Sequence, residues 1–322
     1  MNKRPISIII DDPAPHVHLY HYHMEPQCLT EDGRWLLESV PNEQLDKFVQ
    51  VIKRRGIKGK FSVIPMAAGR GSLKEGFIGA DKKDVDQWVE TVKKDVRPQF
   101  AICSEILTHY KAVDLATGDL LEQNEQEWVR THSLQEVTDY VAASLKMLDE
   151  AGLDPSGVTS PWMTGIEVED MYHEAVSRAF DKALGKKDAW YFLHCYDDGE
   201  GVMPKVYTSG DRRIVSISGT FDDNIWRTIN TPDDSDEMVR SVADLYISED
   251  GKKGQLIDQL KENCWPVLLT HWQSLYSNGL GTGLRALDLV GERIQKHLSD
   301  KGEGVDFNEL MELALNTPEL YV

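Results

Sequence analysis

Seven short runs of mostly apolar residues are spaced along this chain of 322 residues, with stretches of helical periodicity between them. The runs cover residues 6–10, 59–64, 100–103, 157–160, 190–194, 213–217 and 266–271. A short, continuous apolar run is typical of a strand that is buried on both faces. Alternation of such strands with helices is typical of parallel strands joined by crossover helices. The pattern therefore predicts an α/β fold.

Helices are predicted where apolar residues recur every three or four positions. These stretches cover residues 42–54, 83–94, 133–150, 168–184, 234–246 and 284–297. Ser133, with Glu136 three positions later, has the sequence pattern of a capped helix start. Because the alternation runs along the whole chain, residues 1–322 are predicted to form a single irregular (β/α)7-type barrel, TIM-like, with a core of parallel strands.

Two features qualify this prediction. A polar insertion at about residues 110–132 interrupts the rhythm, and we expect it to be a long loop with a turn near 116–119, of a length that often serves function. A doubly wound open sheet is the alternative fold, but it would need a glycine-rich turn after the first strand. Residues 11–15 read Asp-Asp-Pro-Ala-Pro instead.

The composition excludes some kinds of partner. The formal net charge is −19, which disfavours binding to nucleic acid and to anionic membrane surfaces. No apolar run approaches the roughly 20 residues of a membrane span, and no secretory leader is recognisable. We therefore expect a cytoplasmic protein, or a secreted one if a leader has been removed. The four cysteines are scattered and form no C-x-x-C pair, so they predict neither a zinc knuckle nor a redox motif.

Polar side chains follow several of the predicted strands. Asp11 and Asp12 end the first, Glu105 and His109 follow the third, and His271 ends the last. In a (β/α) barrel the functional residues lie at the carboxyl ends of the strands. Neighbouring residues in an extended chain point in opposite directions, so one carboxylate can bind a metal while the other meets water or substrate. Each residue taken alone also has a purely structural interpretation.

A histidine-rich loop follows the two aspartates. It contains His16, His18, His21 and His23 and also carries Tyr20 and Tyr22, and we expect the loop to lie over the site. The i, i+2 spacing suits a pair of metal ligands on an extended segment. Three roles remain open, namely metal binding, contact with substrate through His18 and Tyr20, or an ordinary loop.

The order of these motifs resembles that of the polysaccharide deacetylases, the NodB-type proteins of carbohydrate esterase family 4 in the glycoside hydrolase/deacetylase superfamily. Residues 9–12 (Ile-Ile-Asp-Asp), 105–109 (Glu-Ile-Leu-Thr-His), 160–162 (Ser-Pro-Trp) and 269–271 (Leu-Thr-His) are similar to four motifs of that family, in the same order. The resemblance covers roughly residues 6–300.

The resemblance implies roles for individual residues. Asp11 would be the general base, His271 the general acid, and Asp12 and His109 ligands of a divalent metal. Zinc is the first expectation, with nickel or cobalt as alternatives. The substrate would contact His18, Tyr20, Pro161, Trp162 and Trp272.

Two positions depart from the family pattern. The second metal-binding histidine of the family would fall at Val113, so the third ligand is expected to be the adjacent Asp114, or His132 if the insertion splits the motif. The arginine that precedes Pro-Trp in the family is replaced by Thr159-Ser160.

The predicted function is a divergent, metal-dependent hydrolase that removes acetyl groups from N-acetylated sugars or cleaves a related small amide. A glycoside hydrolase using Asp11 or Asp12 with Glu105 or Asp222 is one alternative. A non-catalytic carbohydrate-binding protein of the same fold is another, because two motifs are incomplete. A later Thr-Phe-Asp-Asp at residues 220–223 is interpreted as coincidence or as part of a loop on the substrate side.

Overall fold

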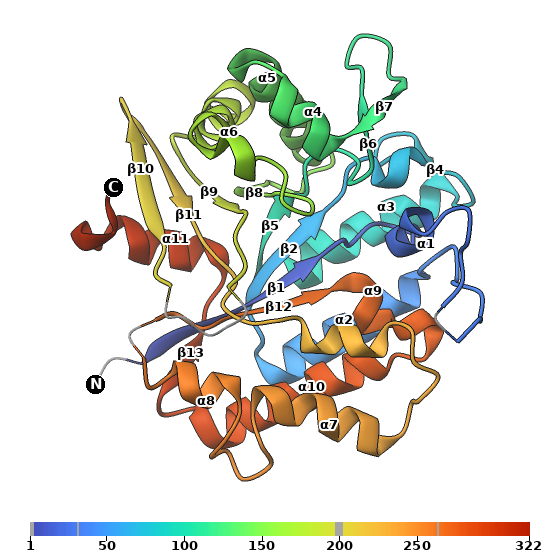
Figure 1. The fold of residues 1–322 in the computed structure, drawn as a ribbon, viewed down its shortest axis with the longest axis vertical. Helices are drawn as coiled ribbons and strands as arrows, with labels where there is room; N and C mark the ends of the chain where they lie inside the picture. Colours follow the sequence, from blue (N-terminus) through green and yellow to red (C-terminus); the bar gives the residue numbers. More distant parts are fainter. Residues whose placement is uncertain (1–2, 31, 197–201, 263) are drawn as a thin grey trace.

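Seven parallel strands form the centre of the computed structural model, which describes residues 3–30, 32–196, 202–262 and 264–322 (Figure 1). They are β1 (Arg4–Asp11), β2 (Gly59–Val63), β5 (Phe100–Ser104), β8 (Gly157–Thr159), β9 (Asp188–Phe192), β11 (Arg212–Ser216) and β12 (Val267–His271). Each coincides with one of the seven apolar runs, to within a few residues. The predicted barrel with a parallel core is therefore confirmed.

The sheet curls into an incomplete barrel. Its strand order is β10-β11-β9-β8-β5-β2-β1-β12, with β10 (Lys205–Ser209) antiparallel to β11 and β13 (Gly302–Gly304) paired to the start of β1. The edges at β10 and β12 do not pair with each other. The segment after β11 crosses this seam, because the Thr220 N–H donates to the Val267 carbonyl of β12 at 2.9 Å.

Helices surround the sheet. They are α1 (Leu19–His23), α2 (Asn42–Arg55), α3 (Lys82–Thr91), α4 (Glu125–Thr131), α5 (Leu134–Glu150), α6 (Glu169–Leu184), α7 (Asp236–Tyr246), α8 (Gln255–Gln259), α9 (Trp272–Tyr276), α10 (Thr282–Leu298) and α11 (Phe307–Leu315). The six predicted helices correspond to α2, α3, α5, α6, α7 and α10. α2 packs between α3 and α10, and α5 packs on α6. Ser133 caps α5 as predicted, since its side chain accepts from the Glu136 N–H.

Apolar side chains fill both sides of the sheet. Inside the barrel, Ile9, Trp190, Val215 and Val267 meet residues of α11, where Phe307 packs on Trp190 with ring centroids 4.8 Å apart. Outside, one cluster lies between the sheet and α2, α3, α7 and α10, and another lies beneath α5 and α6. Because the interior is packed, the barrel is not a pore.

The insertion is more ordered than the loop we expected. β6 (Lys111–Val113) and β7 (Leu120–Asn124) form an antiparallel hairpin, with the predicted turn between them, and α4 follows directly. A second short hairpin consists of β3 (Gly71–Ser72) and β4 (Gly76–Phe77). Asn124 and Glu127 form a capping box at the start of α4, an Asn-x-x-Glu signal visible in the sequence.

Among the described residues, no helix has both the length and the apolar character that crossing a membrane requires.

A close approach in the barrel gives a test of this packing. A Cβ on Gly157 would lie 2.2 Å from the Trp190 ring. We expect Gly157→Ala to lower the free energy of unfolding by about 1–3 kcal/mol, the usual cost of overpacking, in urea denaturation. In a Trp190→Leu background the same substitution should cost markedly less. An equal cost in both backgrounds would contradict the packing described.

Candidate functional site

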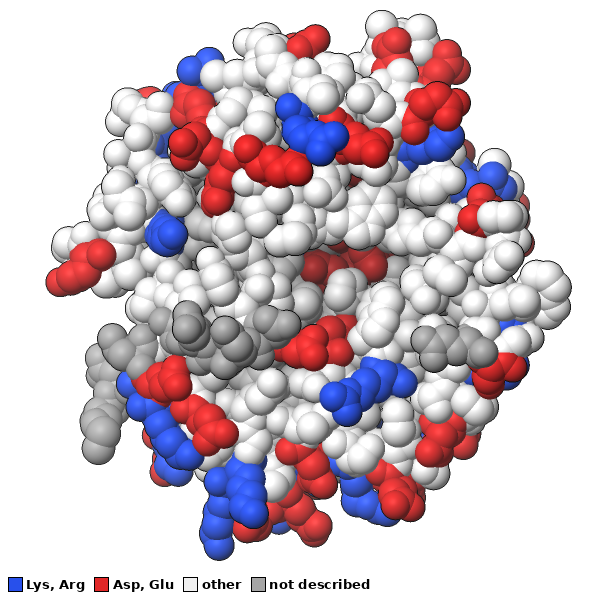
Figure 2. Space-filling view, viewed as in Figure 1, with Lys and Arg blue, Asp and Glu red and all other residues white. Residues whose placement is uncertain are grey.

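A cavity of about 520 Å³ opens at the carboxyl ends of the strands. Figure 2 shows a hollow near the middle of this face, with acidic atoms at its floor. The residues that line the cavity are Asp11, Asp12, Tyr20, His23, Glu105, His109, Ser160, Trp162, Met163, Phe192, Leu193, Cys195, Trp226, Leu269, His271 and Gln273. Most of the polar residues singled out from the sequence therefore meet in one place.

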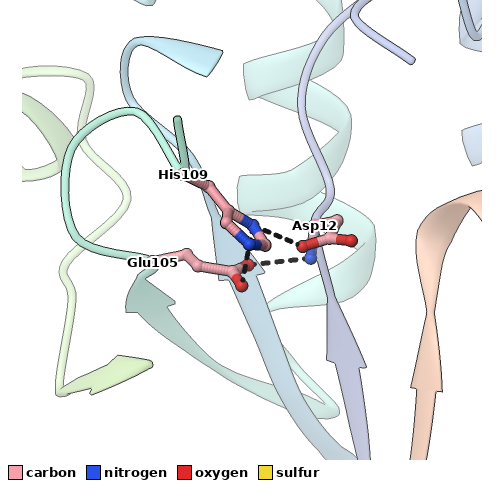
Figure 3. Close-up of side chains that lie close together, drawn as sticks. All are labelled: Asp12, Glu105 and His109. Carbon is pink, nitrogen blue, oxygen red and sulfur yellow. Dashed lines mark hydrogen bonds and ion pairs between the residues drawn. The ribbon is translucent and has the colours of Figure 1, made fainter. Parts of the chain in front are cut away.

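Three buried side chains converge in this cavity (Figure 3). Asp12 Oδ1 lies 2.8 Å from His109 Nδ1, and Glu105 Oε1 lies 3.4 Å from the same nitrogen. The Asp12 N–H donates to Glu105 Oε2 at 2.8 Å. One ligand atom from each residue lies within 4.8 Å of the other two. Asp12 and His109 both have left-handed backbone, with φ of 68° and 50°, which few residues other than glycine adopt.

This donor set fits a divalent metal ion. Asp12 Oδ1 and His109 Nδ1 are buried and face each other at 2.8 Å but have no other hydrogen-bond partner in the described chain, and the buried Nε2 of His109 has none there. Buried polar atoms without a partner are rare and call for an explanation. Carboxylate oxygen and imidazole nitrogen are ordinary zinc ligands. The other oxygen of Asp12, Oδ2, accepts from Gln273 Nε2 at 2.7 Å, which fixes the carboxylate and leaves Oδ1 for the ion.

The pKa values of Asp12 and Glu105 are shifted in opposite directions. Burial tends to raise the pKa of Asp12, but the charge and hydrogen bond of His109, with the charges of His271 and His23, hold it well below its usual range. Burial and the charges of Asp12 and Asp11 raise the pKa of Glu105 well above its usual value. Without a metal, the cluster thus favours one ionised and one protonated carboxyl group.

Asp11 is held by a buried lysine. Lys60, whose side chain is fully buried, forms an ion pair with Asp11 Oδ1 and donates to Ser62 Oγ and Thr159 Oγ1, each at 2.6 Å. Ser62 Oγ also donates to Asp11 Oδ1 at 2.7 Å. No hydrogen bond to Asp11 Oδ2 comes from the described part of the chain. Thr159 is one of the two residues that replace the arginine expected before Pro161-Trp162. The cation beside Asp11 is Lys60 of β2.

His271 forms a pair with Asp223. Its Nδ1 lies 2.8 Å from Asp223 Oδ2, and its Nε2 has no hydrogen-bond partner among the described residues. Burial lowers the pKa of His271, but the Asp223 hydrogen bond and the charges of Asp12, Asp223 and Asp11 outweigh that and raise the pKa to about 9. His271 is therefore a cation at neutral pH.

The substrate-contact predictions have different outcomes. Tyr20 and Trp162 line the cavity, and Pro161 is buried beside Trp162. His18 is fully buried, with its ring near Tyr276, and does not line the cavity.

Trp272 also lies away from the cavity. It belongs to the core, with its ring 5.5 Å from that of Phe48 and 5.7 Å from that of Phe61. The physical reason is alternation, because His271 faces the cavity and the next side chain points away from it.

The structure does not bring either expected third metal ligand to the cluster. Asp114 lies in the β6–β7 turn, where its Oδ1 accepts from the Ala116 N–H at 2.8 Å. The His132 ring stacks on Trp128 at 4.0 Å, and its Nδ1 lies 2.7 Å from the Trp128 carbonyl oxygen. Glu105 occupies the third position of the group instead.

The histidine-rich loop contributes Tyr20 and one of its histidines, His23, to the cavity. His23 Nε2 lies 2.8 Å from the His109 carbonyl oxygen, and its ring packs near His109 and Trp162. Burial and the charge of His109 lower the pKa of His23 to about 4, so its ring is neutral at pH 7. His16, His18 and His21 are not in the group of metal-ligand candidates found in the described chain.

Several residues of the site were not identified from the sequence. Lys60 and Gln273 were missed as partners of the two aspartates, and Asp223 was missed as the partner of His271. Glu105 was noted, but not as a ligand. The available signals were a lysine inside an otherwise apolar strand and the second Asp-Asp pair at residues 222–223.

Comparisons with known proteins bear on the fold. No protein-family model matches the chain, and no curated protein matches its sequence. Among solved structures, it is similar to a provisionally assigned polysaccharide deacetylase from Mycobacterium smegmatis, with a TM-score of 0.50 and 13% identity over 84% of this chain and 76% of that one. At this identity, the similarity shows the fold alone.

Two other solved structures align with lower scores. One is a mutant of a CE4 family pseudoenzyme, with a TM-score of 0.42 and 13% identity over 96% of this chain and 68% of that one. The other is an exo-type maltose-forming amylase from Pyrococcus sp. ST04, with a TM-score of 0.47 and 13% identity over 84% and 40%.

Substitutions can decide which residues bind metal. We expect chelator-stripped protein reloaded with Zn²⁺ to retain about one equivalent, measured by elemental analysis after desalting. His109→Ala and Glu105→Gln should lose it, because each removes a donor from the buried cluster. His132→Ala and Asp114→Asn should retain it. Loss of zinc in either of the latter pair, with normal folding by circular dichroism, would place the third ligand in the insertion.

Proposed function

We propose that this protein is a divergent, metal-dependent hydrolase of the polysaccharide-deacetylase type, which cleaves the acetamide of an N-acetylated sugar or a related amide. One observation carries the proposal. Asp12, Glu105 and His109, which together could hold a metal ion, share a cavity with Asp11 and with His271, the partner of Asp223. Amide hydrolysis needs these three functions, namely a site that stabilises the oxyanion, a base and an acid.

Asp12, Glu105 and His109 would hold the metal, with zinc as the first candidate. When bound there, the ion would supply Lewis-acid polarisation of the amide carbonyl and a lowered pKa for water. Asp11 would act as the base through Oδ2, because Lys60 and Ser62 occupy its other oxygen.

His271 would act as the acid. Its Nδ1 is engaged by Asp223, so the proton for the leaving amine would come from Nε2. Asp11 and His271 are paired residues of the neighbouring strands β1 and β12. This pairing places the base and the acid beside each other at the carboxyl ends of the two strands.

The walls of the cavity suit a sugar. Trp162 is 46% exposed, and Tyr20 packs edge-on against Trp226 with ring centroids 5.4 Å apart. Aromatic faces offer apolar contact to the C–H faces of a pyranose, while the acidic floor offers hydrogen-bond acceptors. A carbohydrate substrate is therefore proposed ahead of a small non-sugar amide.

The direct test is release of acetate from N-acetylated sugar oligomers by the zinc-loaded protein. Asp11→Asn should lower kcat by about 10²–10⁴-fold, the usual range for loss of a general base. Asp222→Asn is the matched control, because this exposed carboxylate lines the adjoining cavity beside Asp223. Substrate binding without turnover in the wild type would indicate a carbohydrate-binding protein instead.

The acid role of His271 predicts a pH dependence. Because the protonated ring is the active form and its pKa is about 9, kcat should fall as the pH rises through about 9. Asp223→Asn removes a hydrogen bond and a charge that raise this pKa, so the fall should move to lower pH by about one unit or more. Glu169→Gln is the control, because Glu169 pairs with His194 at 2.9 Å in the same manner. An unmoved profile in Asp223→Asn would exclude His271 as the acid.

A glycoside hydrolase remains the second candidate, and one observation favours it. Glu105 has a raised pKa beside Asp12, whose pKa is lowered, and such a divergence is the pattern of an acid and a carboxylate partner in glycosidases. This alternative predicts cleavage of glycosidic bonds that survives exhaustive chelation. Activity lost on chelation and restored by Zn²⁺ would favour the amidohydrolase.

A further inference from the structure

Residues 106–109 carry His109 into the cavity along an unusual backbone path. Ile106 has a φ of 43° and His109 a φ of 50°, both in the left-handed region. A β-branched residue rarely adopts this conformation, so surrounding contacts must hold the segment in place. Both residues are buried.

Glu125, the first residue of α4, supplies many of these contacts. Its side chain is fully buried and accepts from three consecutive backbone N–H groups, those of Leu107 at 3.1 Å, Thr108 at 2.9 Å and His109 at 2.8 Å. Tyr140 Oη donates a fourth hydrogen bond at 2.9 Å. The insertion thus contains the carboxylate that accepts hydrogen bonds from the backbone N–H groups of residues 107–109.

The direction of these hydrogen bonds requires a carboxylate. The hydroxyl of Tyr140 accepts from the Val113 N–H at 3.1 Å, so its own proton is available for Glu125. Glu125 Oε1 therefore meets three donors, and Oε2 meets the His109 N–H. Burial raises the pKa of Glu125, and these hydrogen bonds with the charge of His109 oppose that effect and favour the carboxylate. An amide would turn an NH₂ group toward at least one of the four donors.

The carbonyl side of the same segment is held independently. The Met66 N–H donates to the Leu107 carbonyl at 2.9 Å, and the Ala68 N–H donates to the Thr108 carbonyl at 2.9 Å. His23 Nε2 contacts the His109 carbonyl at 2.8 Å. The segment is thus clamped from both sides, but only the amide side depends on a single side chain.

We propose that Glu125 is a positioning residue that sets the orientation of His109 for metal binding. The metal in this inference rests on the proposed function, whereas the hydrogen bonds of Glu125 do not depend on it. Glu125 does not belong to the metal-ligand group and acts through the backbone of residues 107–109. Groups that orient a ligand in this way commonly change metal affinity by about 10–100-fold when they are altered.

The test compares two identical substitutions on one short helix. Glu125→Gln should weaken Zn²⁺ binding by about 10–100-fold, measured by competition with a chromogenic chelator. Glu127→Gln is the matched control, because Glu127 caps the same helix through the Asn124 N–H but does not contact residues 107–109. Equal affinity in folded Glu125→Gln and wild type would overturn the proposal. So would an equal loss in Glu127→Gln, which would attribute the effect to α4 as a whole.

A milder variant covers the case in which Glu125→Gln does not fold. Tyr140→Phe removes one of the four donors and leaves the three backbone N–H groups on the carboxylate. It should weaken Zn²⁺ binding less than tenfold. Unchanged affinity in a folded Tyr140→Phe protein, together with unfolding of Glu125→Gln, would indicate a purely structural role and would overturn the proposal.

A metal-free readout separates this inference from the proposed function. In chelator-treated wild type, the amide protons of Leu107, Thr108 and His109 should exchange slowly with solvent, by NMR. Exchange should be faster in Glu125→Gln, or in Tyr140→Phe to a smaller extent, and unchanged in Glu127→Gln. If wild type binds no Zn²⁺ but shows this pattern, the metal-dependent function fails while Glu125 still positions His109. Rapid exchange in wild type would overturn the positioning role.

Discussion

The parallel pairing of β1 with β12 is the constraint on which the site depends. It places Asp11 opposite His271, and the next residue, Asp12, turns into left-handed backbone toward Glu105 and His109. A shift of one residue in this register would exchange the faces on which these side chains lie. Both faces of β1 are apolar in this sheet, since Ile8, Ile9 and Ile10 are all buried.

Several charged side chains are buried near the paired ends of β1 and β12, and each has a partner or could bind a ligand. Lys60 compensates Asp11, Asp223 compensates His271, and four donors surround Glu125. Removing one member of such a set is costly because it leaves a charge unpaired in a medium of low polarity. The Asp12–Glu105–His109 cluster differs, since within the described chain His109 Nε2 has no partner and Asp12 Oδ1 meets only His109 Nδ1. This contrast separates positions that support the site from positions that await a ligand.

Local patterns predicted the fold, and tertiary contacts decided the rest. Continuous apolar runs located the seven parallel strands, and helical periodicity located α2, α3, α5, α6, α7 and α10, but the short strands β3, β4, β6, β7 and β10 were not located from the sequence. The resemblance implied Asp114 or His132 as the third ligand, but Asp114 lies in the β6–β7 turn and His132 packs on Trp128. The pairing of Lys60 with Asp11 joins neighbouring strands, and that of Asp223 with His271 joins a loop to a strand. No sequence period encodes either pair.

The seam between the two edges of the sheet has a chemical consequence. A closed barrel would bring a strand against β12, and that strand's backbone would occupy the edge beside His271. Here the segment after β11 crosses the gap with single hydrogen bonds and then delivers Asp223 to His271. A connecting loop thus contributes to the basicity of that histidine, together with Asp11 and Asp12 at the end of β1. Loops of this kind accept substitutions that strands do not, so proton affinity at this end of the barrel can change over evolution while the packed interior stays the same.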